Sequence, residues 1–555
     1  MNTRRWLLAI WVCFITRAVF YSTALPVWEG FDEWSHFAVI QRMALRGEFL
    51  PWRYSPISRD IEASLKLAPL PWALRDAPPP AMTHDAYWHL PAEERRRREA
   101  QFHSLPRSWA REDGVGGLVA YEALQPPLYY WVAAPLLRSA SNLDLGTEVL
   151  WLRWLSVMIA SIVVPLSFLV GRSVFRSDSL ALGCAAIIAT MPEFMIDVAR
   201  VGNECVAVVL FTLLTWLIVE SVLTELHYLH ALSIGVVFGL GLLTKAYFLT
   251  ALPPVVLLLA YNFWRSRGKP FQAVSGTLIV ASSSTVIAGW WYIRNLNTTG
   301  TLSGLGAATS LPGTSSEISI LSRVAEIHWP VAIDAILLSH IWFGGWSSLT
   351  IRSWMYHLFY LVISVAAMGL VWLIRRPPII ALTAIHAIFW IGQLYNVLLL
   401  YSATGVATSM GWYMYAVVAA EVTLCIAGLR AISPVRWRRQ VPLIGVLLFA
   451  LLDLYTIHAV AIPYYTGMIS HGTNGALVLH ISRVEVSEIF TRLAAYKTGI
   501  LSGSILLAFW AAYLVATVGL VVVSFACRSK TDVPCRGFGI EATANKSTST
   551  GIPGW

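Results

Sequence analysis

Residues 6–37 read WLLAIWVCFITRAVFYSTALPVWEGFDEWSHF. The first part is predominantly apolar over roughly 20 residues, which is enough for a helix to cross a bilayer. It follows Arg4 and Arg5 as a signal peptide would, but it ends at Leu25 without a small-residue cleavage site. We therefore expect a retained first span with a dense acidic stretch directly behind it.

The composition of the whole chain agrees with a membrane environment. Of the 555 residues, 57% are hydrophobic and only 13% are charged, and the mean hydropathy is +0.62. A water-soluble protein of this composition would expose a largely apolar surface. The 25 Trp, 21 Tyr and 22 Phe fit a membrane protein, because such rings accumulate at the two membrane interfaces. The chain is therefore predicted to be an all-α integral membrane protein.

Apolar segments of span length recur along the sequence. Ten of them begin near Trp6, Trp154, Leu180, Val206, Ala273, Trp354, Pro378, Met410, Val441 and Ile500. The stretch from Leu229 to Trp264 is too long for one ordinary span and is interrupted by Thr244, Lys245 and Pro253-Pro254. It is either one long helix or two short ones.

The positions of the basic residues distinguish these two possibilities. With the N-terminus inside and two spans in this stretch, the short basic loops become cytoplasmic, as the positive-inside rule requires. These loops and the tail carry Arg172, Arg176, Arg265, Arg267, Lys269, Arg375, Arg376, Arg430, Arg436, Arg438, Arg439, Arg528 and Lys530. We therefore predict about twelve spans with both termini in the cytoplasm. The charge of +9 thus reports orientation and does not indicate nucleic-acid binding.

The predicted organisation is a single transmembrane domain over residues 1–526. External regions are expected at 26–150, 294–353 and 463–499, and a disordered cytoplasmic tail rich in Ser, Thr and Gly at 527–555. Within the first region, Leu128 to Leu137 is apolar but only about half a span long, so we expect a helix lying along the interface. The six cysteines imply no disulfide framework.

Behind the first span, Glu29, Asp32, Glu33 and His36 lie within eight residues. If the chain is helical from Phe31, Asp32 and His36 share a face and Glu33 is turned away. A shielded carboxylate beside a histidine can take a proton from a hydroxyl. The same residues would also suit an N-terminal helix cap.

Two more polar groups follow, each with a structural alternative. Glu122, Gln125, Tyr129 and Tyr130 lie beside the expected interfacial helix, where tyrosines are often only membrane anchors. The turn DVARVGNECV carries Asp197, Arg200, Asn203 and Glu204 between two spans, and ionisable groups at this depth are costly. In that turn, Asp197 and Arg200 could simply neutralise each other.

Single cations mark two expected external helix ends, Lys245 and Arg294. Each could hold a negatively charged headgroup, or could snorkel to ordinary phospholipid. Arg17 and Asp453 lie deep inside spans, and we expect both to pair within the bundle.

The order of these pieces is more specific than any one of them. The series DEWSH, QPPLYY, GNE, a Thr-Lys pair, WWYIRN and IWFGGW resembles the GT-C superfamily of polytopic glycosyltransferases, from about Arg17 to Tyr415. That superfamily includes the protein O-mannosyltransferases and the lipid A aminoarabinose transferases. The likeness is greatest to a bacterial branch of predicted membrane proteins.

The resemblance implies an inverting enzyme in a bacterial inner membrane that takes a sugar from polyprenyl phosphate on the non-cytoplasmic side. Asp32 or Glu33 would be the catalytic base, and Lys245, Arg294 and Arg200 would hold the donor phosphate. Supporting or substrate-binding residues would be His36, Gln125, Tyr129, Tyr130, Asn203 and Glu204. The expected partners are membrane lipid, the donor, and a glycan, lipid or protein acceptor.

The sequence departs from the pattern of that superfamily at two places. Related proteins often carry a Gln-Gly-Arg-Tyr run where this chain reads SMGWYMY, so Met410 and Trp412 replace Gln and Arg. Glu204 stands where Asp is more usual, and we therefore expect no obligatory metal and no other cofactor.

Other functions remain open at this point. A transporter or lipid flippase would be expected to show internal symmetry and matching Gly- or Pro-broken helices, and we find neither. A polymerase or ligase of cell-surface polysaccharide usually has one large late external loop, whereas the largest loop here comes first. A non-catalytic lipid-binding member is a further alternative. The sequence contains no GxxxxGK[ST], HExxH, paired CxxC or GxGxxG motif.

Overall fold

The structure is a computed structural model that describes residues 3–48, 55–76, 81–266, 270–304, 322–480, 485–499 and 501–528. In these ranges it is almost entirely helical, with one two-stranded hairpin. The predicted disordered tail at 527–555 lies outside the described residues, apart from its first two positions. The all-α fold class is confirmed.

Ten helices in the described part of the chain are long and apolar enough to cross a membrane. They are α1 (Thr3–Ala24), α7 (Leu145–Ala160) with α8 (Val163–Phe175), α11 (Glu204–Leu223), η4 (Ala246–Ala251) with α13 (Leu252–Arg265), α14 (Pro270–Thr299), α18 (Ser353–Leu370) with η7 (Val371–Leu373), α19 (Pro377–Thr404), η8 (Gly411–Val417) with α20 (Val418–Ile432), α21 (Val441–Tyr455) with η9 (Thr456–Ala461) and α22 (Ile462–Tyr465), and α24 (Gly503–Arg528).

A bent pair of helices and two shorter apolar helices complete the bundle. They are α9 (Asp178–Ile188) with α10 (Pro192–Val198), bent by 67°, and α12 (Tyr228–Leu242) and α17 (Trp329–Ile341). The Leu229–Trp264 stretch therefore forms two helical segments, as the charge pattern predicted. Twelve segments match the predicted spans if the bent pair and α12 each cross the membrane.

The remaining elements lie in the regions predicted to be external. They are α2 (Glu33–Arg46), α3 (Arg59–Leu67), η1 (Trp72–Leu74), α4 (His84–Tyr87), α5 (Ala92–His103), η2 (Arg107–Arg111), η3 (Tyr121–Leu124), α6 (Leu128–Ala140), η5 (Arg323–Glu326), η6 (Gly345–Ser347), α23 (Val486–Ala494) and the antiparallel strands β1 (Ile469–His471) and β2 (Leu477–Leu479). The expected helix from Leu128 is thus present as α6.

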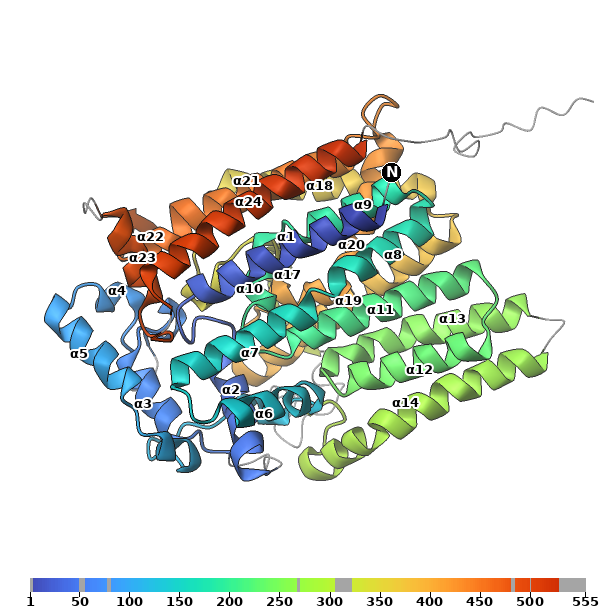
Figure 1. Cartoon of the computed structure of the whole chain (residues 1–555). Helices are drawn as coiled ribbons and strands as arrows, with labels where there is room; N and C mark the ends of the chain where they lie inside the picture. The colour runs from blue at the N-terminus through green and yellow to red at the C-terminus, as the bar shows by residue number, and fades with distance from the viewer. Residues whose placement is uncertain are drawn as a thin grey trace, which may run out of the picture.

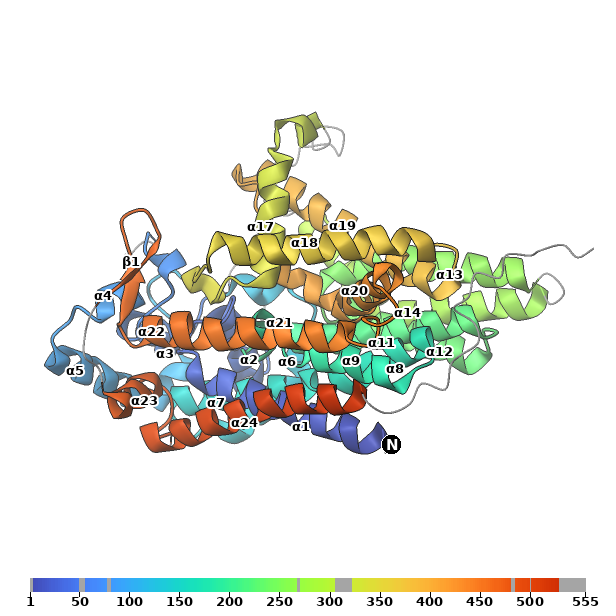
Figure 2. The ribbon, with the colours of Figure 1, turned by 90° about the horizontal axis from the view of Figure 1, so that it is seen from above.

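The long helices run side by side, and the shorter elements gather at one end of the bundle. In Figures 1 and 2, α2 to α5 and α23 lie at the end opposite the N-terminus of α1. This arrangement brings the predicted first and third external regions together. The acidic stretch behind α1 therefore lies where the bundle meets these short elements.

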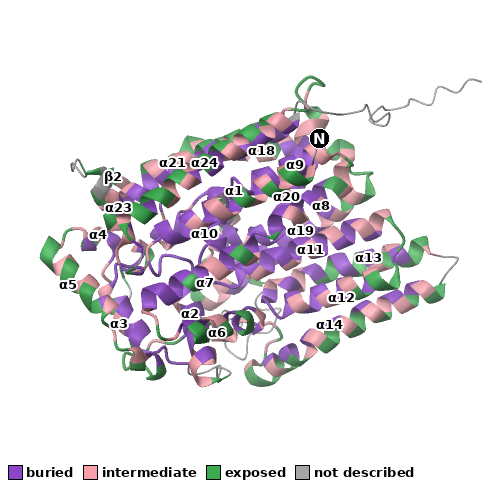
Figure 3. Cartoon of the chain, in the orientation of Figure 1, coloured by how far each residue is buried: buried purple, intermediate pink, exposed green. Residues whose placement is uncertain are grey.

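Buried residues concentrate on the inner helices, and exposed apolar residues on the outer ones. Figure 3 shows α10 and α11 as largely buried, whereas α14 and α24 carry exposed residues along their length. Val286 on α14 and Val515 on α24 are 80% and 73% exposed, respectively. Apolar side chains facing outward in this way are what a lipid solvent favours.

The break between α9 and α10 is explained by proline and by a buried arginine. Pro192 begins α10, and Arg17 donates hydrogen bonds to the carbonyls of Ala189 and Thr190, which the end of α9 leaves free. Arg17 also pairs with Asp453 at 2.8 Å, with both side chains fully buried. The expectation that these two residues pair within the bundle is confirmed, and the partner of each is the other.

Candidate functional site

The turn between α1 and α2 places Asp32 at the start of a helix without using it as a cap. Asp32 precedes α2 with φ 56°, a left-handed conformation that is uncommon for a residue other than glycine. Its side chain makes no capping hydrogen bond, and its Oδ1 instead accepts one from the Tyr121 hydroxyl at 2.8 Å. Asp32 thus stands at the N-cap position of α2, but its carboxylate does not cap the helix.

The three carboxylates of this turn differ in exposure and in bonding. Glu29 and Glu33 are both fully buried, whereas Asp32 is partly exposed. Glu29 accepts a hydrogen bond from the backbone N–H of Ser347 at 3.0 Å and lies 3.2 Å from His84 Nε2. Only Asp32 of the three is thus accessible to an incoming molecule.

Glu33 is occupied by an ion pair and by backbone donors. Arg153 on α7 donates to both of its oxygens, at 2.7 and 2.6 Å. The N–H groups of Trp28 and Val201 donate to the same carboxylate at 3.1 and 3.0 Å. A carboxylate accepts about four hydrogen bonds, so Glu33 has no acceptor position left for a substrate proton.

His36 lies in the first turn of α2, whereas Asp32 precedes the helix in a left-handed conformation, so the condition for a shared helical face is not met. Its Nδ1 lies 2.9 Å from the Tyr130 hydroxyl, and its Nε2 lies 3.8 Å from Glu122. Burial, together with the positive charges of Arg200 and Lys245, lowers the pKa of His36 well below its usual range. His36 is therefore neutral at physiological pH and contacts Tyr130 and Glu122, while Asp32 is bound by Tyr121.

The surroundings of Glu122 change the pKa of its carboxyl group. Burial and the neighbouring negative charge of Asp32 raise the pKa of Glu122 to about 7, against the opposing charges of Lys245 and Arg200. Its backbone N–H donates to Ser35 Oγ at 3.0 Å, which holds η3 against α2. Near neutral pH, Glu122 is thus divided between its protonated and ionised forms.

This raised pKa predicts a pH dependence of stability. The folded state binds the proton more tightly than the unfolded chain, so the stabilisation is present at low pH and is lost as the pH rises toward about 7. We expect Glu122→Gln to flatten the fall in melting temperature between pH 5 and 7. The melting temperature at each pH is measured by thermal unfolding of the detergent-purified protein. Glu112→Gln, which changes a half-exposed carboxylate, is the control. Equal slopes in wild type and Glu122→Gln would contradict the prediction.

A chain of charges links the α10–α11 turn to the end of α12. Arg200 lies 3.1 Å from Asp197 and 2.8 Å from Glu204, and it donates to the Phe31 carbonyl at 2.6 Å. Glu204 also pairs directly with Lys245. Asp197 and Arg200 therefore do pair, but within a larger network, and Lys245 is buried in the protein instead of snorkelling.

The other predicted supporting residues lie around this chain. The Asn203 side chain donates to the Thr244 carbonyl at 3.0 Å and lies 3.5 Å from Gln125 Oε1. The Tyr129 hydroxyl accepts from the N–H of Gly202 at 3.2 Å. These bonds join α6, the α10–α11 turn and the end of α12, so the three motifs that carry these residues are neighbours in space.

The turn between α1 and α2, residues 26–33, is called the Asp32 turn, and the turn between α10 and α11, residues 199–203, the Arg200 turn. The two turns pack tightly against each other. A Cβ added to Gly30 would lie 2.6 Å from the Arg200 Cβ and 3.0 Å from its Cδ. Real Cβ contacts are not that short, so one of the two turns would have to move.

We therefore expect Gly30→Ala to lower the free energy of unfolding by about 1–3 kcal/mol, the usual cost of overpacking. Gly499→Ala is the control, because nothing lies within 4 Å of the added Cβ there. Chemical or thermal unfolding of the two variants measures the difference. Gly30→Ala with the stability of the control would show that the turns can separate at no cost.

Arg294 lies on α14 and is only partly buried. Its guanidinium lies over the Trp291 ring of the same helix, 4.7 Å from the ring centroid. Trp412 is buried and stacks on Phe31 with the ring centroids 3.6 Å apart. An aromatic ring therefore packs directly against the turn that carries Asp32.

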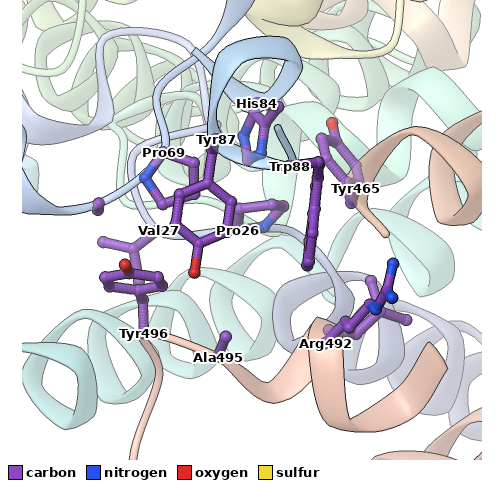
Figure 4. Close-up of a pocket in the computed structure, with 12 residues that line it drawn as sticks. Pro26, Val27, Pro69, His84, Tyr87, Trp88, Tyr465, Arg492, Ala495 and Tyr496 are labelled. Carbon is purple, nitrogen blue, oxygen red and sulfur yellow. The ribbon is translucent and has the colours of Figure 1, made fainter. Parts of the chain in front are cut away.

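A small recess begins at the other end of the same turn. Figure 4 shows Tyr87, Trp88, Tyr465 and Tyr496 around it, with Arg492 beneath Trp88. Pro26 and Val27 line this recess, whereas Asp32 of the same turn faces Tyr121.

Sequence reasoning missed Arg153 and Tyr121 and gave Glu122 no role in the site. Arg153 stands alone in the apolar run EVLWLRWLSV, and an isolated cation in such a run could have been recognised as a buried partner for an acid. In the part of the chain that the structure describes, no group of three or more His, Cys, Asp or Glu side chains could hold a metal ion. The expectation of no obligatory metal stays a prediction.

Comparison with known proteins agrees with the order of the motifs. Residues 125–300, about a third of the chain, match the model of the family described as dolichyl-phosphate-mannose-protein mannosyltransferase. The predicted resemblance to the GT-C superfamily is confirmed. The matched segment supports a glycosyltransferase-type enzyme in the membrane. Of the predicted GT-C site it includes Gln125, Tyr129, Tyr130, Arg200, Asn203, Glu204, Lys245 and Arg294.

Solved structures of other proteins show a loose similarity over most of the chain. The structure of ArnT from Cupriavidus metallidurans bound to undecaprenyl phosphate is 14% identical, with a TM-score of 0.41, and the match covers 95% of this chain and 79% of ArnT.

The apo oligosaccharyltransferase of Archaeoglobus fulgidus is 13% identical, with a TM-score of 0.41, and the match covers 95% of this chain and 56% of that one. The present chain thus spans little more than half of the archaeal enzyme. Among curated proteins, none has a significantly similar sequence.

Proposed function

We propose that this protein is an inverting glycosyltransferase that moves a sugar from a polyprenyl-phosphate donor to an acceptor on the non-cytoplasmic side. The proposal places it in a bacterial inner membrane with both termini in the cytoplasm. It is supported by the family match over residues 125–300 and by one observation above all. Asp32, a partly exposed carboxylate, lies in one cluster with the buried cations Lys245 and Arg200.

Asp32 is the base in this proposal. The acceptor hydroxyl oxygen attacks the anomeric carbon on the face opposite the phosphate, and Asp32 takes the hydroxyl proton as that bond forms. The bond from the anomeric carbon to the phosphate oxygen breaks, and polyprenyl phosphate leaves with the electron pair. Glu33 is excluded from this role because its four acceptor positions are filled by Arg153, Trp28 and Val201.

Lys245 and Arg200 bind the departing phosphate in this proposal. Both are held in position by Glu204, and the ammonium group of Lys245 has three N–H donors, so it can serve Glu204 and a phosphate together. Negative charge grows on the leaving phosphate in the transition state, so fixed donors there lower the barrier.

Two cations face the four carboxyl groups of Asp32, Glu122, Asp197 and Glu204. The bound phosphate would favour protonated Glu122, which reduces repulsion at the site.

The proposal is tested with the purified protein, synthetic polyprenyl-phosphate sugars and an extract of cell-envelope acceptors. Transfer of labelled sugar that requires the intact donor lipid is the expected result. Release of the sugar without an acceptor product, or movement of intact donor across a vesicle membrane without bond cleavage, would instead indicate hydrolysis or lipid transport. Neither result is compatible with the transferase proposal.

A further inference from the structure

Arg153 uses every donor of its guanidinium group. An arginine side chain has five N–H donors. Nε and Nη2 each donate one hydrogen bond to Glu33. Nη1 donates to the carbonyls of Ser22 and Leu25 at 2.9 and 2.8 Å, and Nη2 donates its second bond to the Pro26 carbonyl at 2.7 Å. The Arg153 side chain is only 2% exposed, and that of Glu33 is 0% exposed. Because all five donors are used and the side chain is buried, Arg153 is held in one position by Glu33 and the surrounding backbone.

The carbonyl partners of Arg153 belong to the end of α1. The last carbonyls of a helix have no partner within the helix, and a cation there is favoured by the helix dipole. Arg153 therefore caps the end of α1 and holds the chain where it enters the turn that carries Asp32.

The carboxylate partner of Arg153 extends this connection to a third segment. Glu33 accepts from the N–H of Trp28 inside the Asp32 turn and from the N–H of Val201 beside Arg200. Trp28 and Asp32 both have positive φ, 68° and 56°, and such conformations persist only where the surroundings impose them. The ion pair therefore connects the end of α1, the turn carrying Asp32 and the turn carrying Arg200.

We propose that Arg153 is a positioning residue that, through Glu33, sets the Asp32 carboxylate at its distance from Arg200. The role of Asp32 in transfer rests on the proposed function, whereas the placement of the two turns does not. A displacement of about 1 Å at a reacting group can cost roughly 10²-fold in rate.

The test replaces the buried pair by apolar side chains of similar size, Glu33→Leu with Arg153→Met. Breaking only one partner would leave an unpaired buried charge, whereas replacing both commonly preserves folding. The matched control is Arg17→Met with Asp453→Leu, an equally buried pair that makes no described contact with either turn. Arg153→Lys and Glu33→Gln serve as further variants in case the double variant does not fold.

The first measurement is hydrogen exchange of residues 26–33 and 199–203, which needs no substrate. We expect exchange in both segments to be at least about tenfold faster in the Glu33–Arg153 variant and unchanged in the control. Wild-type exchange rates in both segments of the variant would overturn the proposal. If the wild-type protein transfers no sugar, the proposed function fails, and exchange still decides whether Arg153 holds the turns.

The second measurement separates positioning from donor binding. Transfer by the Glu33–Arg153 variant should lose about 10²-fold in kcat, while the donor KM should rise less than in Lys245→Ala, because Lys245 is on neither turn and only Arg200 is on one of them. Arg153→Lys should be intermediate, since lysine keeps the charge but has three donors in place of five. Wild-type kcat in the Glu33–Arg153 variant would overturn the positioning role.

Discussion

Asp32→Asn is expected to lower sugar transfer by about 10²–10⁴-fold, the range that loss of a general base usually causes. Asparagine has the same shape and can still accept the hydrogen bond that Tyr121 donates to Asp32. The turn should therefore keep its structure and its donor affinity while losing the proton acceptor. Transfer and donor binding are measured on the same preparation, so that the two effects can be separated.

Two other acid substitutions make this result specific. Asp113→Asn removes a half-exposed carboxylate that pairs with Arg42 and Arg46, and it should leave transfer unchanged. Glu33→Gln should lower the melting temperature together with activity, because it leaves Arg153 without its charged partner. Wild-type transfer by Asp32→Asn would remove the base assignment.

Lys245→Ala is expected to weaken binding of the polyprenyl-phosphate donor by roughly 10–100-fold. Hydrogen bonds to charged groups contribute about 1.5–3 kcal/mol each, and 1.4 kcal/mol corresponds to tenfold in affinity. The Lys245 side chain is 9% exposed and pairs with Glu204, so its position is fixed before the donor arrives. Titration of the protein in nanodiscs with a polyprenyl phosphate measures the affinity.

Arg294→Ala is the informative comparison. The sequence predicted that both cations bind the phosphate, but Arg294 is only partly buried, so water screens its charge more than that of the buried Lys245. We therefore expect a smaller effect than for Lys245→Ala. Equal weakening would show that α14 also reaches the phosphate, and unchanged affinity in both variants would exclude them as phosphate ligands.

The helices were predictable because span length and charge asymmetry are local properties of the sequence. Hydropathy located the spans, and the basic loops correctly favoured two segments between Leu229 and Trp264. The bend between α9 and α10 was not predicted. It depends on Pro192 and also on Arg17, which is distant in sequence and satisfies the carbonyls that the break leaves free.

The sequence indicated which residues lie together in the candidate site, but not the role of each residue. The order of the motifs suggested that Asp32, Arg200 and Lys245 share a site, and their mutual electrostatic effects agree. Periodicity cannot show which faces of distant helices meet, so it could not distinguish Asp32 from Glu33. That distinction required Arg153, whose bonds to Glu33 are visible only in three dimensions.

The pairing of Arg17 with Asp453 has a consequence for how the protein is made. Helices enter the membrane in the order of synthesis, so α1 is inserted with an arginine whose carboxylate partner lies on one of the last helices to emerge. An unpaired arginine at the centre of a membrane helix costs about 2.5–3.5 kcal/mol on insertion scales. The ion pair that neutralises this arginine can therefore form only after α21 has left the ribosome.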